Sequence, residues 1–184
     1  AVISALENKN IIRTFDDEFF RKPYEYEEEL DNSPINLSNE QLKAYTGLLK
    51  LFNDDKANGA LLYGVTGSGK TKVYLKLIDD ALKTDKGIIV MIPEISLTPQ
   101  MLSLFYSRYG NKVAVCHSAL SLGQRLDEWK RIKNGDAKIA IGTRSAVFAP
   151  FDKIGLVIID EEQEHTYKSE MSPRYNAKEV ARYR

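Results

Sequence analysis

A glycine-rich segment contains the residues best suited to bind phosphate. Residues 64–71 read Gly-Val-Thr-Gly-Ser-Gly-Lys-Thr, which matches G-x-x-x-x-G-K-[ST] at every fixed position. In such a loop the backbone N–H groups surround phosphate oxygens, the lysine reaches the β- and γ-phosphates, and the final hydroxyl holds Mg²⁺. We therefore predict a nucleoside triphosphate site with Lys70 as a catalytic residue and Thr71 as a metal ligand. The expected nucleotide-binding residues of the motif are Gly64, Thr66, Gly67, Ser68, Gly69, Lys70 and Thr71.

The residues on either side of this segment predict the elements that position it. The apolar run 60–63 precedes it and predicts a buried strand. A helix is expected after it, because apolar side chains recur at the i, i+3, i+4 and i+7 positions of residues 74–81. The N-terminus of a helix favours anions, so a strand, a glycine loop and a helix in this order support phosphate binding.

A second apolar run ends in carboxylates. Residues 155–159 are followed by Asp160, Glu161, Glu162 and Gln163. A fully apolar run of this length predicts a central parallel strand that is buried on both faces. Ligands of open α/β sheets bind at the carboxyl ends of the strands. We therefore expect Asp160 to hold Mg²⁺ through water and Glu161 to orient or deprotonate an attacking water.

Composition excludes several classes of protein. The chain has 184 residues, 43% of them hydrophobic, and a formal net charge of zero, so a core can form and no overall basic field indicates nucleic acid. The single cysteine, Cys116, leaves no intramolecular disulfide and no cysteine-rich zinc site. No apolar stretch has transmembrane length and no signal peptide is evident. We therefore expect a cytoplasmic protein without a membrane partner.

Organisation changes near residue 37. Residues 1–36 include the acidic run 25–29 and are expected to be the tail of a preceding domain plus a linker. From residue 37 to 184, strands and helices alternate, which predicts an α/β fold with a mostly parallel sheet and helices on both faces. The expected strands are 60–63, 88–92, 113–116, 138–142 and 155–160. The expected helices are 38–52, 70–83, 99–109 and 122–133, with another beginning near Asn176.

The segments between the two nucleotide motifs are distinctive. Pro-Glu-Ile-Ser-Leu-Thr-Pro-Gln occupies residues 93–100, and Gly-Thr-Arg-Ser-Ala-Val-Phe occupies residues 142–148. Together with the segments 64–71 and 160–163, these strings resemble superfamily 2 helicases, and more closely the PriA-type family of primosomal replication-restart DNA helicases. The resemblance extends from about residue 41 to residue 184.

This resemblance implies that the chain is the first RecA-like lobe of a two-lobe, ATP-driven DNA motor. In the family, a second lobe supplies an arginine finger, and the motor moves 3′ to 5′ in replication restart. The resemblance further implies ATP and Mg²⁺ as cofactor and metal, no zinc in this stretch, forked or single-stranded DNA as partner, and replication-restart proteins as partners of the full-length chain. Residues 1–30 could be the end of the family's winged-helix domain. By itself the stretch is expected to be monomeric and nearly inactive, because loss of an arginine finger costs on the order of 10³–10⁵ in turnover.

The resemblance also assigns individual residues. Gln41 matches the adenine-reading glutamine of the family, although Ser38 and Gln41 also form a capping-box pattern. The expected DNA-contacting residues are Thr98, Gln100, Thr143, Arg144, Ser145, Tyr167, Lys168 and Arg174. For these residues local capping, ion pairing and local packing remain the alternatives. The stripe of Leu122, Leu126, Trp129 and Ile132 on the helix 122–133 is expected to pack in the core.

The chain departs from the family pattern at two places. Gln163 stands where the family has histidine; its amide can hydrogen-bond a γ-phosphate and is counted as catalytic, but it cannot titrate. Pro173 stands where the family commonly has tryptophan, before Arg174 and Tyr175.

Two functions of other classes remain as alternatives. A P-loop kinase would need a phosphate-acceptor pocket and an arginine-rich lid, and the segments 160–163 and 142–146 argue against it. A non-catalytic, nucleotide-switched nucleic-acid-binding module would not need the intact Lys70, Thr71, Asp160 and Glu161.

Overall fold

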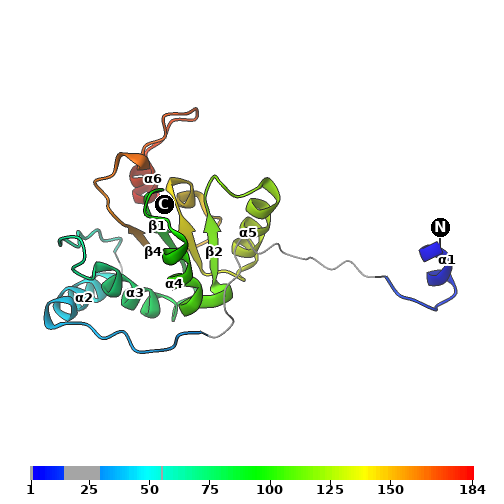
Figure 1. Cartoon of the computed structure of the whole chain (residues 1–184), viewed down its shortest axis with the longest axis horizontal. Helices are drawn as coiled ribbons and strands as arrows, with labels where there is room; N and C mark the ends of the chain where they lie inside the picture. The colour runs from blue at the N-terminus through cyan, green and yellow to red at the C-terminus, as the bar shows by residue number, and fades with distance from the viewer. Residues whose placement is uncertain (1, 15–29, 55) are drawn as a thin grey trace.

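The computed structural model describes residues 2–14, 30–54 and 56–184. Its centre is a four-stranded sheet in the order β2-β3-β1-β4 (Figure 1). The strands are β1 (Gly87–Met91), β2 (Val113–Cys116), β3 (Ile139–Gly142) and β4 (Ile154–Ile159). All three strand pairings are parallel. The α/β class with a parallel sheet is therefore confirmed.

Helices cover both faces of the sheet, as expected. The first face packs against α3 (Lys70–Ala81) and α4 (Pro99–Tyr109) in a cluster that includes Ile88 and Val90 of β1. The second face packs against α5 (Leu122–Asn134), η2 (Arg144–Phe148) and α6 (Ala177–Tyr183) in a cluster that includes Ile89 and Met91. Alternate residues of β1 thus pack in the clusters on opposite faces of the sheet, as the two-residue period of a strand buried on both faces requires.

The remaining elements lie at the margins of this core. They are α1 (Val2–Asn8), α2 (Asn39–Phe52), η1 (Gly110–Lys112) and η3 (His165–Tyr167). In Figure 1, α1 lies apart from the sheet, whereas α2 packs beside α3. The expected helix starts are confirmed at the caps: Ser38 and Ser121 form capping boxes, Thr98 caps α4, and Asn176 caps α6. The acidic run 25–29 lies outside the described residues.

The expected strand at residues 60–63 is absent from the sheet. Residues 57–65 have no strand assignment, and Leu61 and Tyr63 are 72% and 91% exposed. The expectation was wrong: an apolar run forms a strand only when its backbone groups pair with a neighbouring strand, and this run pairs with none of the described strands. The outer edge of β4 is left unpaired within the described sheet.

Residues 155–159 form a parallel strand as expected, but the strand is neither central nor fully buried in the described sheet. The run is a parallel strand, but β4 is an edge strand of the described sheet and each of its six residues is only partly buried. By contrast, all five residues of β1, which has neighbours on both sides, are buried. The apolar composition of β4 identified the strand type and could not identify its place in the strand order.

Candidate nucleotide site and the loops at the carboxyl end of the sheet

The phosphate loop leads directly into α3. Gly67 and Gly69 have φ values of +80° and +79°, a left-handed conformation that glycine adopts without steric cost. A Cβ at Gly64 would lie 2.8 Å from Ser68 Oγ, so the absence of a side chain at position 64 lets Ser68 pack closely against the first residue of the loop. Lys70 Nζ donates to the carbonyl oxygens of Gly64 and Val65 at 2.7 and 3.0 Å. The loop therefore holds its cation among its own backbone groups at the start of a helix, which is an arrangement suited to phosphate.

Gln41 lies against this loop. Its Nε2 donates to the carbonyl oxygen of Ser68 at 2.9 Å, while its Oε1 accepts from the Ser38 N–H at 3.0 Å. One amide thus caps α2 and contacts the phosphate loop at the same time. A Cβ at Gly69 would lie 2.4 Å from this Nε2, so glycine at position 69 also makes room for the glutamine. Adenine recognition by Gln41 remains a prediction.

Asp160 and Glu161 follow β4 directly and are both partly buried. Asp160 Oδ1 accepts from the Glu161 N–H at 3.0 Å, and Asp160 Oδ2 accepts from the phenol of Tyr74 at 3.3 Å. Glu161 has a φ of +46°, and its Oε2 accepts from Ser96 Oγ at 3.1 Å. Left-handed φ at a non-glycine residue is uncommon and often marks a functional site. Neither Tyr74 nor Ser96 was predicted to act at the site: Tyr74 is one of the apolar positions of residues 74–81, and Ser96 lies within the distinctive string 93–100.

These residues fit a Mg²⁺ ion that is completed by a nucleotide. Tyr74 lies three residues after Thr71 on α3 and donates to Asp160, so the helix that carries Thr71 also contacts the carboxylate. A hydroxyl and a carboxylate are hard oxygen ligands of the kind that Mg²⁺ prefers, and the remaining positions are taken by water and phosphate. No group of three or more His, Cys, Asp or Glu side chains among the described residues could hold a metal ion without such additional ligands.

The expected DNA-contacting residues follow the carboxyl ends of β1, β3 and β4. Thr98 Oγ1 accepts from the Met101 N–H at 3.3 Å as the cap of α4, and Gln100, the second residue of that helix, is exposed. After β3, Thr143 precedes η2, and Ser145 Oγ donates to the carbonyl oxygen of Cys116 at 3.3 Å. The hydroxyls of Thr98 and Ser145 therefore have local partners, and all four side chains lie at the end of the sheet that also holds Asp160.

Arg144 ties this end of the sheet to the segment after β4. Its Nη1 donates to the carbonyl oxygens of Thr166 and Lys168 at 3.3 and 3.2 Å. Arg144 is partly buried, and its two hydrogen bonds anchor a loop. The expected alternative of a surface ion pair is not seen among the described residues, where the partners of Arg144 are carbonyl groups.

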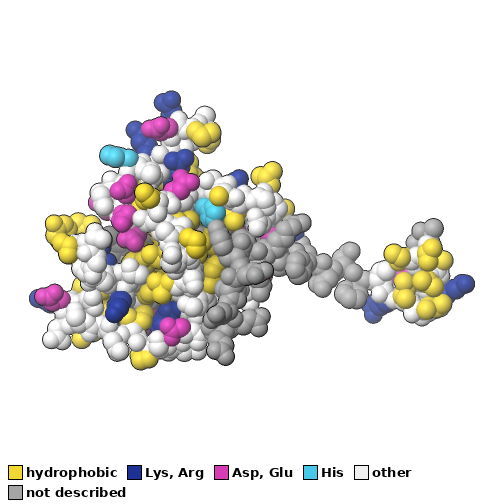
Figure 2. Space-filling model, viewed as in Figure 1, with side chains coloured by type: hydrophobic (Ala, Val, Ile, Leu, Met, Phe, Trp, Pro, Cys, Tyr) yellow, Lys and Arg dark blue, Asp and Glu magenta, His cyan; other side chains and the backbone are white. Residues whose placement is uncertain are grey.

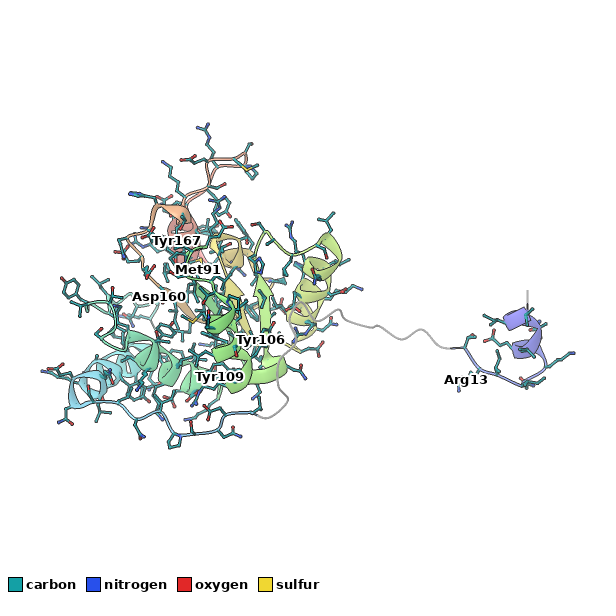
Figure 3. The ribbon with its side chains drawn as sticks, viewed as in Figure 1. Arg13, Met91, Tyr106, Tyr109, Asp160 and Tyr167 are labelled. Carbon is teal, nitrogen blue, oxygen red and sulfur yellow. The ribbon has the colours of Figure 1, made fainter. Side chains whose placement is uncertain are left out.

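The structure corrects the expectation that Tyr167 contacts DNA. It was expected to present its ring to bases, but it is 1% exposed and packs in the second core cluster. Its hydroxyl lies 3.0 Å from the carbonyl oxygen of Met91 and 2.5 Å from that of Asp160 (Figure 3). Burial raises the pKa of the phenol, and the charges of Asp160 and Glu161 add to the shift, so the hydroxyl stays a donor. Tyr167 therefore braces the ends of β1 and β4 from the second face of the sheet.

Residues 168–176 leave the body of the molecule after η3 and return to it at the start of α6. An antiparallel bridge joins Lys168 to Asn176, and the segment between them projects from the body of the molecule next to α6 (Figure 1). Lys168, Met171 and Arg174 are exposed. Gln163 is also exposed, so its expected contact with a γ-phosphate remains a prediction.

The structure also corrects the expectation that the apolar stripe on α5 packs in the core. Only Ile132 is buried, at 3% exposure, whereas Leu122, Leu126 and Trp129 are 81%, 54% and 48% exposed. Instead α5 is anchored by Glu128, which accepts from the Val115 N–H at 2.9 Å and pairs with Arg131 at 2.8 Å. The helical period was correct, but the helix is turned so that much of its apolar face is outside the core.

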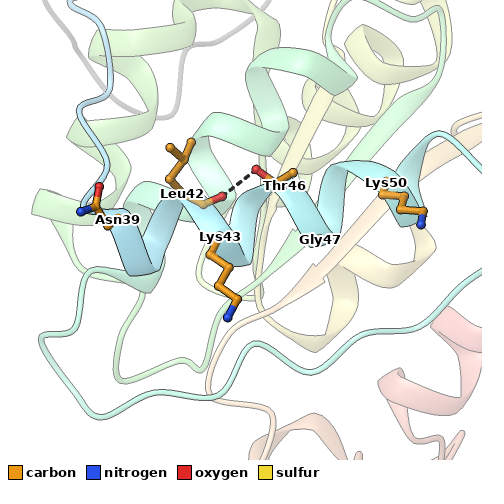
Figure 4. A pocket seen from close by; sticks show the side chains of 6 residues that line it. All are labelled: Asn39, Leu42, Lys43, Thr46, Gly47 and Lys50. Atoms are coloured by element: carbon orange, nitrogen blue, oxygen red, sulfur yellow. Dashed lines mark hydrogen bonds between the residues drawn. The ribbon is translucent and has the colours of Figure 1, made fainter.

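Surface features away from the phosphate loop are shallow or mixed in charge. A hollow on the outer side of α2 is lined by residues of that helix alone (Figure 4): Asn39, Leu42, Lys43, Thr46, Gly47 and Lys50. Lys and Arg side chains are interspersed with Asp and Glu on the face seen in Figure 2, as the net charge of zero suggests. None of the helices described is long and apolar enough to cross a membrane.

Comparisons with known proteins agree with the motifs. The family model "DEAD/DEAH box helicase" matches residues 39–181. The chain is 45% identical over 181 residues to the replication restart protein PriA of Bacillus subtilis (strain 168), covering 98% of this chain and 22% of that protein. It is 40% identical over 188 residues to the PriA of Haemophilus influenzae, covering 98% of this chain and 25% of that protein.

The chain therefore spans about a quarter or less of the length of these relatives, and its residues match throughout the part that it spans. The matched stretch 39–181 contains the phosphate loop, the acidic segment after β4 and the loops at the carboxyl end of the sheet. On this evidence the chain belongs to the DEAD/DEAH box helicase family.

Proposed function

We propose that this chain is the ATP-binding motor lobe of an ATP-dependent DNA helicase that acts in replication restart. The observation that carries the proposal is the meeting of the phosphate-loop helix with the end of β4: Tyr74 of α3 contacts Asp160 at 3.3 Å across the sheet edge. This contact brings the residues of the two nucleotide motifs to one site. PriA proteins of several bacteria are similar to the chain, which supports replication restart as the process.

In the proposed site, the backbone of residues 64–71 binds the phosphates and Lys70 neutralises charge on the β- and γ-phosphates. Mg²⁺, when bound by Thr71 and Asp160, would stabilise the charge of the phosphate oxygens. Glu161 accepts a proton from the attacking water or orients it, and Ser96 fixes the glutamate by donating to Oε2. Gln163 would reach the γ-phosphate, and Gln41 would read the adenine once its amide exchanges the Ser68 carbonyl for the base.

On the nucleic-acid side, we propose contacts with the DNA backbone from Thr98, Gln100, Thr143, Ser145, Lys168 and Arg174. These side chains lie in the segments that follow β1, β3 and β4 of the parallel sheet, so they can share one strand of DNA. Arg144 joins the group by holding Thr166 and Lys168, and it could reach DNA only by exchanging those carbonyl partners. Hydroxyl, amide and cationic groups of this kind fix a protein on a nucleic-acid backbone without reading its sequence.

The wider setting is also proposed. A second lobe would complete the nucleotide site, the motor would move 3′ to 5′ on forked or single-stranded DNA in the cytoplasm, and replication-restart proteins would bind the full-length chain. Residues 37–184 would be the first lobe, a monomer that is nearly inactive in isolation, and residues 1–36 would end a preceding domain.

The decisive experiment measures ATP turnover of the natural full-length protein with and without forked DNA, with Lys70→Ala as the control. We expect turnover that rises with DNA and is lost in the variant. Turnover that is indifferent to DNA would overturn the helicase proposal and favour a P-loop kinase, which needs an acceptor instead. Nucleotide binding without turnover would favour a nucleotide-switched binding module.

A further inference from the structure

Tyr74 occupies a position between the two candidate metal ligands. It is the fifth residue of α3, it is 5% exposed, and its phenol points out of the core toward the end of β4. The hydroxyl donates to Asp160 Oδ2 at 3.3 Å, and Thr71 lies three residues before Tyr74 on the same helix. Residues three apart on a helix lie on one face, so Thr71 and Tyr74 face β4 together.

The contact leaves Asp160 held at both of its oxygens. Oδ1 accepts from the Glu161 N–H at 3.0 Å, Oδ2 accepts from Tyr74 at 3.3 Å, and the Asp160 N–H donates to the carbonyl oxygen of Met91 at 2.9 Å. The phenol is the part of this set that comes from the phosphate-loop helix. The orientation of the carboxylate relative to Thr71 therefore depends on Tyr74.

The phenol is suited to hold a carboxylate permanently. A phenol keeps its proton at neutral pH because its ordinary pKa is about 10, so the Tyr74 hydroxyl donates to the carboxylate oxygen that lies 3.3 Å away. A hydrogen bond from a neutral donor to a carboxylate is stronger than one between neutral groups. A neutral phenol does not compete with the carboxylate for a cation.

We propose that Tyr74 is a positioning residue that sets the Mg²⁺ affinity of the site by holding Asp160 in register with Thr71. The inference rests on the proposed nucleotide site. Outer partners of metal ligands generally fix ligand orientation, and their loss weakens metal binding by about 10–100-fold. Tyr74 would act in this way without touching the metal or the nucleotide.

The chain offers a matched control in Tyr109. This residue is also 5% exposed, and its hydroxyl donates to the carbonyl oxygen of Leu75 at 3.1 Å and contacts Asp79 Oδ1 at 3.1 Å. Like Tyr74, it is buried and uses its hydroxyl on a carboxylate, but it reaches α3 from the end of α4, and its partners Leu75 and Asp79 are not metal-ligand candidates. A merely structural role would make Tyr74→Phe and Tyr109→Phe behave alike.

The test uses the natural full-length protein and a fluorescent methylanthraniloyl derivative of ADP, whose binding is followed while Mg²⁺ is titrated. We expect Tyr74→Phe to raise the Mg²⁺ midpoint about tenfold. Nucleotide affinity in EDTA should stay at the wild-type value. Tyr109→Phe should lower the melting temperature and leave the Mg²⁺ midpoint unchanged. In an Asp160→Asn background, Tyr74→Phe should have no further effect on the midpoint, because the carboxylate that it orients is gone.

A wild-type Mg²⁺ midpoint in folded Tyr74→Phe would overturn the inference, and so would a full additional shift in the Asp160→Asn background. If Tyr74→Phe does not fold, Tyr74→Met is the second variant, because methionine has similar length and favours helices; it carries the same expected shift. A wild-type protein whose nucleotide binding does not respond to Mg²⁺ would instead overturn the proposed function, and the two failures are therefore distinguishable.

Discussion

The phosphate loop at residues 64–71 and the segment at residues 161–176 lie at the same end of the sheet but are held in different ways. The loop is closed by contiguous residues: glycines at positive φ and a lysine that donates to carbonyl groups five and six residues away. The second segment is held by residues distant in sequence, since Arg144 binds carbonyl groups 22 and 24 residues on and Tyr167 reaches Met91 across 76 residues.

The difference has a functional consequence. A loop closed by its own backbone can keep one shape with or without the rest of the site. A segment held by an arginine and a buried tyrosine can change shape when those contacts exchange, and Tyr167 contacts the backbone of Asp160 itself. The segment at residues 161–176, called here the second region, is therefore the one that could connect nucleic acid to the nucleotide site. The phosphate loop is the first region, and the following substitutions test the difference between the two.

The largest effect is expected in the first region. Lys70→Ala should lower DNA-stimulated ATP turnover by at least about 10²-fold, because one preorganised charge at the transferred phosphate is lost. Steady-state turnover measures this. Lys72→Ala, an exposed lysine on the same helix, is the control and should keep wild-type turnover. Equal losses in the two variants would show that the effect is not specific to the loop.

A smaller effect is expected where the second region is anchored. Arg144→Ala should lower the ratio of DNA-stimulated to unstimulated turnover about tenfold, because hydrogen bonds from a charged donor to the Thr166 and Lys168 carbonyl groups are lost. Turnover at saturating DNA is the measurement, and Arg182→Ala on α6 is the control. A pure change in DNA affinity with an unchanged ratio would make Arg144 a direct DNA contact instead.

The exposed cations of the second region should affect affinity alone. Replacing Lys168 or Arg174 by alanine should reduce the slope of log affinity against log salt by about 1 for each phosphate contact removed. Fluorescence anisotropy with single-stranded DNA at several salt concentrations measures the slope. Lys153→Ala, an exposed lysine just before β4, should leave the slope unchanged. A slope that is unaffected by the first two variants would exclude the projecting segment from the DNA interface.

The smallest effect is expected inside the second region. Tyr167→Phe keeps the buried ring and removes only the hydroxyl that bonds the Met91 or Asp160 carbonyl, so it should cost about 1–2 kcal/mol of unfolding free energy. Urea denaturation measures this loss. A variant with unchanged stability and weaker DNA binding would return Tyr167 to the nucleic-acid interface and contradict its role as a brace.

The sequence predicted well wherever a pattern was local. The helices beginning near residues 38, 99 and 122 and the four strands of the sheet were all predicted within two residues of their positions. Helix starts depend on neighbours a few residues away, and the presence of a strand depends on the composition of one short run. The failures had another origin: the run 60–63 and the stripe on α5 had the correct periods, but no neighbouring element covers them within the described residues.

By itself, the sequence determined the phosphate loop, the acidic end of β4 and the class of fold, because each is specified by residue types at fixed short spacing. Only the tertiary structure decided that Tyr167 is a buried brace and that Tyr74 meets Asp160 across 86 residues. The physical reason is that a side chain's environment is set by what packs against it. Such packing comes from elements that no local spacing identifies, so neither the burial of Tyr167 nor the contact between Tyr74 and Asp160 could be read from the sequence.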